Sequence, residues 1–320
     1  MRRASSRGRR DGGISVIRPR RLRPGDRIAL LAPASGFKTA DLEAGVREIR
    51  RLGFDAVYPP DVFTRTWFEA GPPDHRARLL HEAWRDPSIA AIVAIRGGYG
   101  SQQLLPLLQP ETLRNGRKWL IGYSDVTTLL CWSLMHGVVS LHGPMIEGRL
   151  SAGPMAYDEA SFLRAVSIAE PLGLQSSETV DVFVQGETSG IVMGGTLTQI
   201  TTLLGTPWAL DVPRGAILLL EDVSERPYRI HRMLTQLAQS GTLARAGALV
   251  FGEFRGCDEP GGPPAIRDVL REFTRGFPGP VLFGFPFGHT TGRSLSIPIG
   301  VRGRVVTALA GLVIEEAAVE

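Results

Sequence analysis

Cysteine is nearly absent from this 320-residue chain, which has only Cys131 and Cys257. Two cysteines cannot make the disulfide framework of a small secreted domain, and they suit a reducing compartment. Long apolar runs are absent too, and none approaches the ~20 residues that a bilayer span needs. Since 43% of the residues are nevertheless hydrophobic, the chain can fill a real core. These features favour a soluble protein of enzyme size, with no membrane partner.

Lysine is equally scarce, with only Lys38 and Lys118, and no Cys/His cluster has metal-ligand spacing. The formal charge of +4 arises at the N-terminal end. Residues 1–23 contain nine Arg and one Asp, a charge of +8, so residues 24–320 carry 4 − 8 = −4. A mildly acidic body without a basic patch gives no support for nucleic-acid binding. We expect neither a metal nor a cofactor.

The Arg-rich segment 1–23 is predicted to be a disordered basic tail, because its first thirteen residues lack apolar content. It also lacks the apolar core of a secretory signal. It is interpreted either as a contact for an anionic surface or, preferably, as an upstream extension from a mis-assigned start. Its removal is expected to leave the body unaffected.

Buried strands and amphipathic helices alternate in the first half of the chain. The predicted strands are 28–32, 54–58, 89–95 and 118–122, and the predicted helices are 40–52 and 74–85. This alternation indicates a parallel sheet with helices on both faces. We therefore predict an α/β fold with an N-terminal doubly wound domain over 24–150.

The second half has a different pattern. Residues 151–187 have little periodicity and are predicted to be a linker. From residue 188 onward short strands dominate, with helices near 196–204, 229–238 and 265–275. This part, 188–320, is predicted to form a smaller, β-rich α/β domain.

Ser124 stands at a sharp predicted turn in the segment WLIGYSDVTT (119–128). An apolar strand ends just before it, and helix-forming sequence runs from 126 to 136. Such a turn lifts the hydroxyl clear of the sheet, and the first N–H groups of the helix face the same space. The spacing departs from G-x-S-x-G, because Val126 stands at the second glycine position. By itself the motif also fits an ordinary turn. Cys131, on the same helix, is expected to be a buried apolar residue rather than a nucleophile.

An acid and a histidine follow two later apolar runs. Glu221 comes directly after the run 215–220, and His289 after 280–288. Serine, acid and histidine in this order occur in catalytic triads, and the ends of strands are usual places for catalytic side chains. Glu221 could instead cap the next segment or pair with a nearby arginine. The rival acids are Asp222, Glu225 and Glu253; the rival histidines are His75, His81 and His231, expected at the surface, and His136 and His142.

Three glycines, Gly97, Gly98 and Gly100, follow the predicted strand at 92–95. Glycines let the backbone approach a ligand closely and supply positive φ angles. A phosphate-binding loop is the other interpretation, but the segment lacks Gly-Lys-Ser/Thr and misses G-x-G-x-x-G.

The whole set of motifs, in this order, resembles the LD-carboxypeptidases of serine peptidase family S66, which include muramoyltetrapeptide carboxypeptidases and microcin C immunity-type hydrolases. The resemblance covers about residues 22–313. The matching blocks are PGDRI (24–28), APASG (32–36), RGGYGS (96–101), LLP (104–106), IGYSDVT (121–127), HGPM (142–145), GGTL (194–197), GTPW (205–208), LED (220–222), YR (228–229) and FGH (287–289).

Carried over block by block, the resemblance implies Ser124 as nucleophile, Glu221 as acid and His289 as base. It implies that the glycine block forms half of the oxyanion hole, where the backbone N–H of Gly98, preferred over that of Gly97, would join that of Asp125. Residues that could bind the substrate are Gly97, Tyr99, Arg96 and Arg232. An N-terminal domain of the Rossmann or amidotransferase-like type is implied, with the site in the cleft between the two domains.

The resemblance also implies an activity. The expected enzyme is a metal-free, cytoplasmic, homodimeric serine carboxypeptidase that removes the terminal D-Ala from murein tetrapeptides in cell-wall recycling. One alternative is a hydrolase of peptidyl or aminoacyl sulfamoyl-adenylates, for which we assign no aromatic platform from the sequence. The other is a non-catalytic muropeptide-binding protein.

Overall fold

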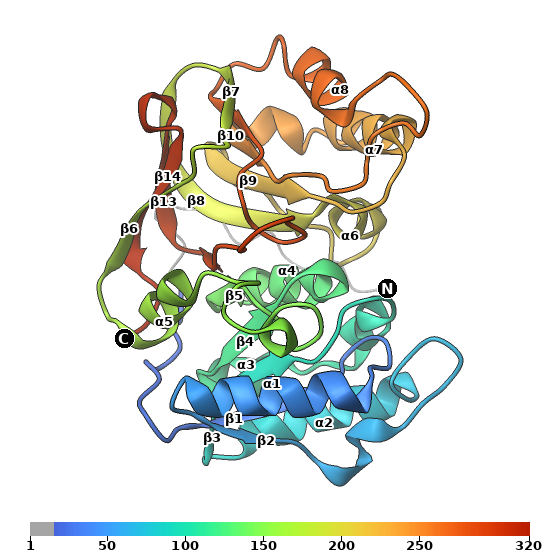
Figure 1. Cartoon of the computed structure of the whole chain (residues 1–320), viewed down its shortest axis with the longest axis vertical. Coiled ribbons are helices and arrows are strands. Elements are labelled where there is room, and N and C mark those ends of the chain that lie inside the picture. The colour runs from blue at the N-terminus through green and yellow to red at the C-terminus, as the bar shows by residue number, and fades with distance from the viewer. Residues whose placement is uncertain (1–15) are drawn as a thin grey trace, which may run out of the picture.

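The computed structural model describes residues 16–320, which form two α/β halves that lie one above the other in Figure 1. The lower half contains a six-stranded sheet in the order β12-β5-β4-β3-β1-β2. Its strands are β1 Arg27–Leu31, β2 Asp55–Val57, β3 Ile89–Ala94, β4 Trp119–Gly122, β5 Ser140–His142 and β12 Ile297–Ile299. All neighbouring strands except β12 and β5 pair in parallel.

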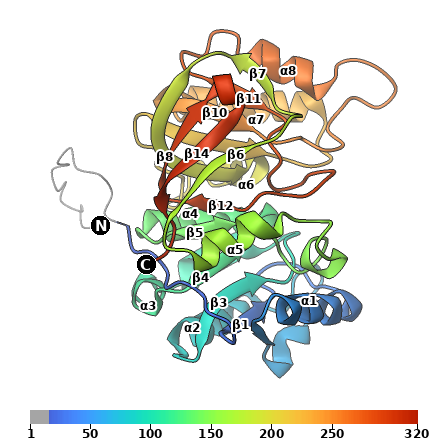
Figure 2. The ribbon, with the colours of Figure 1, turned by 60° about the vertical axis from the view of Figure 1, so that its left-hand side comes forward.

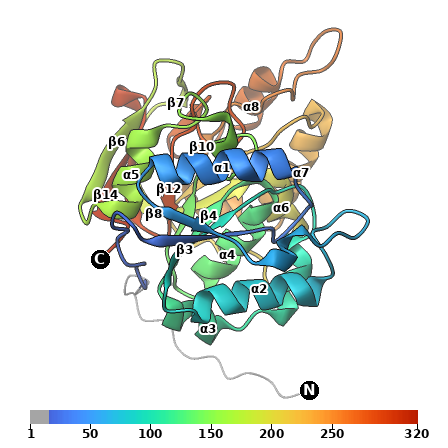
Figure 3. The ribbon, with the colours of Figure 1, turned by 60° about the horizontal axis from the view of Figure 1, so that its bottom comes forward.

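The parallel part of this sheet has the doubly wound order 2-1-3-4-5, in which the chain reverses direction between β1 and β3. In Figure 3, α1 lies on one face of the sheet, and α2 and α3 lie on the other. Ligands of such sheets bind beyond the carboxyl ends of the strands, at the point of reversal. The glycine block after β3 lies at that edge.

The upper half contains an eight-stranded sheet in the order β6-β14-β13-β8-β9-β10-β11-β7. Its strands are β6 Pro171–Ser176, β7 Asp181–Val184, β8 Glu187–Thr196, β9 Ala216–Glu221, β10 Ala246–Phe251, β11 Val281–Phe283, β13 Arg302–Val306 and β14 Gly311–Ala317. The central strands β8, β9, β10 and β11 are parallel. The predicted fold class, a doubly wound α/β domain with a β-rich α/β partner, is confirmed.

The helices follow the apolar periodicity of the sequence. They are α1 Thr39–Arg51, α2 Pro73–Arg85, α3 Pro110–Gly116, α4 Thr127–Met135, α5 Glu159–Ser167, α6 Leu197–Thr202, α7 Pro227–Gln239 and α8 Ile266–Phe273. The helix α1 buries one apolar stripe, whereas α4 is buried on nearly all sides. A helix that is apolar all round belongs in a core, and α4 lies between the two halves in Figure 1. Among the described residues, no helix is long and apolar enough to cross a membrane.

The interval 151–187, predicted to be a linker, contains regular structure. It forms α5, β6 and β7, and these two strands are the opposite edges of the upper sheet. Their pattern is weak because edge strands are only partly buried, as the four half-buried residues of β7 illustrate. Moreover, β12 lies within the predicted C-terminal domain but pairs with β5 of the lower sheet. The two halves are therefore connected at more than one point.

The predicted basic tail falls partly outside the described residues, which begin at residue 16. Residues 16–23 differ from the prediction, because they are held against the body. Ile17 pairs with Val138, Leu22 is only 3% exposed, and Arg18 contacts the β14 strand. Figure 2 shows this segment running beside the C-terminal end of the chain. A few apolar residues between arginines were enough to anchor it.

Candidate active site

Ser124 lies two residues after the last residue of β4, at the start of a short 3-10 helix that leads into α4. Its φ angle is +60°, a left-handed conformation that costs energy in a non-glycine residue and is found at nucleophile elbows. Gly122 explains the missing second glycine: a Cβ there would lie 2.8 Å from Val126 Cγ1. The turn therefore needs a glycine at position 122, before the serine, because the side chain of Val126, after the serine, occupies the space that a Cβ would need.

The glycine block after β3 contacts this turn. A Cβ on Gly97 would lie 3.0 Å from Ser124 Oγ and 3.2 Å from the backbone nitrogen of Asp125. The missing side chain therefore leaves an open space between the hydroxyl and the first N–H groups of the helix. The backbone N–H groups of Gly97 and Gly98 donate to no residue in the described part of the chain.

The side chain of Asp125 fastens the two loops together. Its carboxylate accepts a hydrogen bond from the Ser101 backbone at 2.8 Å, and Ser101 Oγ donates to the Asp125 carbonyl at 2.5 Å. Burial raises the pKa of Asp125, and these hydrogen bonds oppose the rise. Ser101 and Asp125 are both buried, and two hydrogen bonds join them. These bonds fix the distance between the glycine block, which precedes Ser101, and the turn at Ser124. The sequence analysis assigned Asp125 only its backbone N–H and missed this second contact.

Glu221 and His289 meet at the carboxyl ends of β9 and β11. Oε2 of Glu221 lies 2.7 Å from His289 Nδ1 and also accepts the His289 backbone N–H at 3.0 Å. The Glu221 side chain is 1% exposed, and glycines enclose it: a Cβ on Gly288 would lie 2.6 Å from its Cδ. Burial by itself raises the Glu221 pKa, but the charge and hydrogen bond of His289 outweigh it and lower the pKa to about 2. Glu221 is therefore an ionised acceptor that fixes the orientation of the imidazole.

Next to the Glu221–His289 pair, the upper half of the molecule contacts α4 of the lower half. Thr196, at the end of β8, donates to Glu221 Oε1, and its backbone N–H donates to Thr127 Oγ1 of α4 at 3.1 Å. The ring of Tyr123, next to Ser124, lies 4.9 Å from the His289 ring. The residue directly before Ser124 thus packs against the imidazole that Glu221 holds. Ser124 Oγ itself makes no hydrogen bond to a described residue, as is common for a catalytic serine before substrate binds.

Arg149 holds the loop that carries His289. It is 6% exposed, and its guanidinium donates to the carbonyl oxygens of Gly288, Thr290 and Gly292 at 2.7, 3.2 and 3.1 Å. It also donates to Ala156 in the same half as its own residue. The sequence analysis missed Arg149, because no local signal tells a buried arginine from the many exposed ones.

The other predicted substrate contacts are scattered. Arg96 donates to the Gly36 carbonyl at 2.8 Å and lies 3.2 Å from Glu147, so it lines the same edge of the sheet. Tyr99 is 55% exposed beside the glycine block. Arg232 is exposed on α7, 5.7 Å from the Tyr228 ring, and no interaction links it to the three central side chains.

The rival residues occupy different environments. His81 was expected at the surface but is buried, and it accepts the Gln109 backbone N–H at 3.1 Å. His142 is fully buried behind the site, with its ring 5.2 Å from the Phe287 ring, and burial lowers its pKa to about 4.

Two further rival side chains belong to Cys131 and Asp222. Burial raises the pKa of the Cys131 thiol to about 12, consistent with an apolar role. Asp222 turns away and accepts from Thr198. In residues 16–320, no cluster of three or more His, Cys, Asp or Glu could hold a metal.

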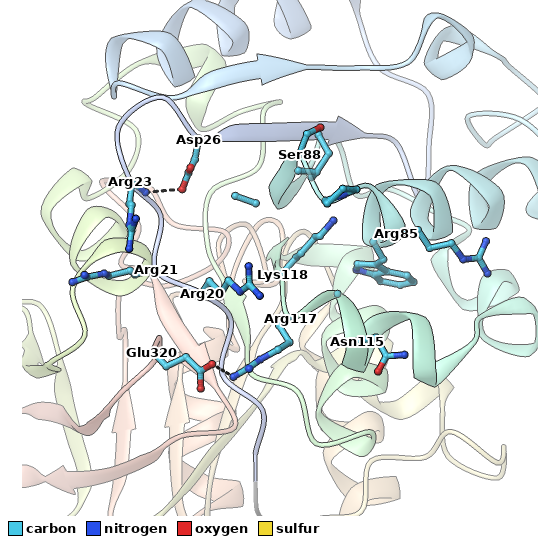
Figure 4. A pocket seen from close by; sticks show the side chains of 15 residues that line it. Arg20, Arg21, Arg23, Asp26, Arg85, Ser88, Asn115, Arg117, Lys118 and Glu320 are labelled. Atoms are coloured by element: carbon cyan, nitrogen blue, oxygen red, sulfur yellow. Dashed lines mark hydrogen bonds and ion pairs between the residues drawn. The ribbon is translucent and has the colours of Figure 1, made fainter.

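A polar cavity of about 540 Å³ lies at the opposite edge of the lower sheet, where β1, β3 and β4 begin. Figure 4 shows Arg20, Arg117 and Lys118 on its wall. Because parallel strands begin at that edge, this cavity is separated from Ser124 by the length of the sheet. It takes no part in the arrangement described above.

Comparison with known protein families matches two segments of the chain. Residues 28–143 match the LD-carboxypeptidase N-terminal domain, and residues 189–305 match the LD-carboxypeptidase C-terminal domain. Together these matches cover more than half of the sequence. The chain belongs to the LD-carboxypeptidase family.

Relatives in this family are similar over most of their length. A murein tetrapeptide carboxypeptidase of Pseudomonas aeruginosa is 34% identical over 270 residues, covering 82% of this chain and 88% of that protein. The crystal structure of a muramoyltetrapeptide carboxypeptidase from Oxalobacter formigenes is 30% identical, with a TM-score of 0.80, and covers 91% of this chain and 99% of that one.

The microcin C7 self-immunity protein MccF of Escherichia coli is a further relative, 26% identical over 300 residues, which cover 85% of this chain and 87% of that protein. Its structure in complex with glutamyl sulfamoyl guanosine has a TM-score of 0.87 at 22% identity and covers 95% of this chain and 100% of that one. At this identity the likeness shows the fold alone. By its family this protein is a peptidase. Its relatives include murein tetrapeptide carboxypeptidases and a microcin self-immunity protein.

Proposed function

We propose that this protein is a serine LD-carboxypeptidase that releases the terminal D-Ala from murein tetrapeptides. The observation that carries the proposal is the packing of Tyr123, the residue before Ser124 on its strained strand-to-helix turn, against His289 of the buried Glu221–His289 pair. The murein tetrapeptide carboxypeptidase at 34% identity supports the choice of substrate. We further propose cytoplasmic cell-wall recycling as the setting and a homodimer as the assembly.

In the proposed mechanism Ser124 Oγ attacks the carbonyl carbon of the scissile amide, and His289 Nε2 takes the hydroxyl proton. His289 Nδ1–H donates to Glu221 Oε2, which leaves Nε2 as the proton acceptor. The developing oxyanion accepts hydrogen bonds from the backbone N–H groups of Asp125 and Gly98, in the space that Gly97 leaves open. The imidazolium then gives its proton to the amine of D-Ala, and the C–N bond breaks.

The acyl-enzyme is hydrolysed in the second half of the reaction. A water molecule attacks the ester carbonyl while His289 takes one of its protons. The tetrahedral adduct collapses, the proton returns to Ser124 Oγ, and the tripeptide leaves with a new carboxyl group, whose proton passes to solvent. Glu221 remains ionised throughout, in agreement with its low pKa. Atoms balance as one tetrapeptide and one water giving one tripeptide and one D-Ala.

Three variants test the proposal. Ser124→Ala and His289→Ala should each lower the turnover of D-Ala release roughly 10⁴-fold, and the double variant should lose little more, because triad members act as a unit. Glu221→Gln should cost less, since it only orients and charges the base. Circular dichroism checks the fold, and mass spectrometry of the products measures release. Full activity of Ser124→Ala, with loss of activity in Asp222→Asn or Cys131→Ala, would contradict both assignments.

The second candidate is hydrolysis of peptidyl or aminoacyl sulfamoyl-adenylates, which the similarity to the MccF self-immunity protein favours. Offering both substrate types to the same preparation separates the two activities. A protein that binds murein peptide but releases no product from either substrate would be the non-catalytic binder instead.

A further inference from the structure

Three large aromatic side chains are exposed together on the lower half of the molecule. Trp67 is 94% exposed, Phe68 66% and Tyr99 55%; we call these three residues the aromatic rim. The Phe68 and Tyr99 rings meet edge to face, with centroids 6.2 Å apart. Large aromatic residues normally bury most of their surface, so an exposed cluster of them marks a binding surface. The exposed Trp67 ring has little packing role within the chain.

The aromatic rim is attached to the glycine block beside Ser124. Ser35, after β1, pairs with Glu69 in a β-bridge, and its Oγ accepts the Tyr99 backbone N–H at 3.0 Å. The loop that carries Trp67 and the loop that carries Gly97 are therefore joined through one serine. The Trp67 loop follows β2 and bridges to the segment after β1, and the Gly97 loop follows β3, so both lie at the carboxyl edge of the sheet, where this sheet type binds its ligands.

The loop of the aromatic rim is internally braced. The Glu69 carboxylate accepts from Thr66 Oγ1 at 2.8 Å, from the Phe68 backbone at 3.3 Å and from Gln103 Nε2 at 3.1 Å. Arg65 donates to the Phe37 carbonyl at 2.8 Å. Several hydrogen bonds thus fix a segment of only five residues, so that a ligand meets aromatic faces already in position.

The rim borders a hollow of about 730 Å³ whose other lining residues are polar: Arg65, Thr66 and Glu69. A surface that combines ring faces with a hydroxyl, a carboxylate and a guanidinium suits a ring bearing hydroxyl groups. The C–H face of a pyranose is apolar and weakly positive, and packs on the negative face of an aromatic ring. Its hydroxyls remain at the edge, within reach of polar side chains.

We propose that the aromatic rim binds the sugar ring of a muramoyl peptide while the peptide extends to Ser124. This inference rests on the proposed function and names its substrate more closely. Three residues separate the sugar from the scissile bond, and they span roughly 10 Å when extended. Tyr99 lies two residues beyond Gly97, at most about 7 Å along the backbone, and its ring reaches farther.

The kinetic test compares free tetrapeptide with N-acetylmuramoyl-tetrapeptide. Wild type should have a lower KM for the muramoyl substrate. Trp67→Ala should raise that KM about tenfold with kcat unchanged, leave the KM for the free tetrapeptide as it was, and be partly rescued by Trp67→Phe. Leu309→Ala, which removes an exposed apolar side chain from the upper half, is the matched control and should change neither substrate. Equal effects of Trp67→Ala on both substrates, or none, would overturn the proposal.

A binding test keeps the two proposals separate. In Ser124→Ala protein the muramoyl peptide should quench the fluorescence of Trp67, and the quenching should vanish in Ser124→Ala/Trp67→Ala. The quenching measures binding and does not depend on hydrolysis. If wild type hydrolyses neither substrate but the quenching is seen, the proposed function is refuted and the sugar site is not. Quenching by AMP but not by the muramoyl peptide would show that the rim holds a nucleobase and overturn the sugar assignment. A dimer that dissociates in sedimentation when Trp67 is replaced would show that the rim is a subunit contact.

Discussion

At the scale of single residues, the site depends on side chains that are missing as much as on those present. Gly97 has an ordinary φ angle, so alanine could adopt its backbone conformation, but the added Cβ would lie 2.8 Å from Ser124 Cβ and 3.0 Å from Oγ. The methyl group would fill the proposed oxyanion space.

Gly97→Ala should therefore lower kcat about 10²–10³-fold, the usual cost of losing one oxyanion contact, and leave the protein folded. Gly276→Ala is the matched control, because a Cβ there would meet nothing within 4 Å. Steady-state D-Ala release measures the effect, and thermal unfolding checks the fold. Wild-type turnover in Gly97→Ala would place the oxyanion elsewhere.

A second prediction at this scale concerns Asp222, next to Glu221. Burial raises the pKa of Asp222 to about 6, and the neighbouring Glu221 charge adds to the rise, against the hydrogen bonds from Thr198. A folded-state pKa above the model-peptide value of 3.8 means that the protonated form stabilises the fold. That contribution is complete below pH 3.8 and is lost as the pH rises through 6.

Asp222→Asn should therefore abolish this loss of stability, so that the melting temperature of the variant relative to wild type rises between pH 4 and 6. Glu221 has the opposite sign, since its pKa is lowered: its contribution is present above pH 4.5 and lost as the pH falls toward 2. The two windows overlap only between pH 3.8 and 4.5, so the loss of stability above pH 4.5 belongs to Asp222. Glu43→Gln, at an exposed carboxylate, should follow the wild-type profile. A constant difference between Asp222→Asn and wild type would contradict the assignment.

At the scale of elements, the loop after β11 receives its shape from an arginine in the other half of the chain. Arg149 satisfies three carbonyl oxygens of the segment 288–292. Arg149→Met should leave these carbonyls without a partner and let His289 shift, and a misplacement of about 1 Å can cost 10²-fold in rate.

We expect kcat to fall about 10- to 100-fold in Arg149→Met, with a smaller change in KM and a lower melting temperature. Arg149→Lys should recover part of both, because one ammonium can still donate to some of the carbonyls. Arg47→Met, at an exposed arginine of α1, is the control. Unchanged kcat in a destabilised Arg149→Met protein would show that the arginine supports only stability.

At the scale of the whole molecule, residues 16–22 connect parts that are distant in the sequence. The backbone of Leu22 donates to Val166, Ile17 pairs with Val138, and Arg18 lies 3.1 Å from Glu316. The half-buried ion pair is still reached by solvent and contributes little, whereas burying Leu22 stabilises by about 1.5–3 kcal/mol.

Deleting residues 1–22 should therefore lower the melting temperature by several degrees, at about 2–4 °C per kcal/mol for a chain of this size. Deleting residues 1–15 is the matched control and should leave it unchanged. Differential scanning calorimetry compares the two truncations with the full chain. Equal melting temperatures for all three proteins would support the original prediction that the entire Arg-rich segment is dispensable.

The local sequence pattern predicted the structure correctly where neighbouring residues alone form an element. The strand before Ser124, the turn and the helix after it are all encoded within residues 119–135, and the structure has them in place. The same holds for the glycine block. The edge strands β6 and β7 escaped prediction, because half-buried strands have weak alternation and depend on partners far away in the chain.

The sequence by itself determined the strand and helix alternation of the first half, the α/β class and the residue types that can perform serine chemistry, because each follows from short-range periodicity or from a motif with its own backbone requirement. Only the tertiary structure decided which residues meet. Thr196 reaches Glu221, Arg149 reaches the His289 loop and β12 crosses to the lower sheet through contacts that span 25 to more than 100 residues. Such contacts depend on how two sheets pack against α4, and no local pattern encodes that packing.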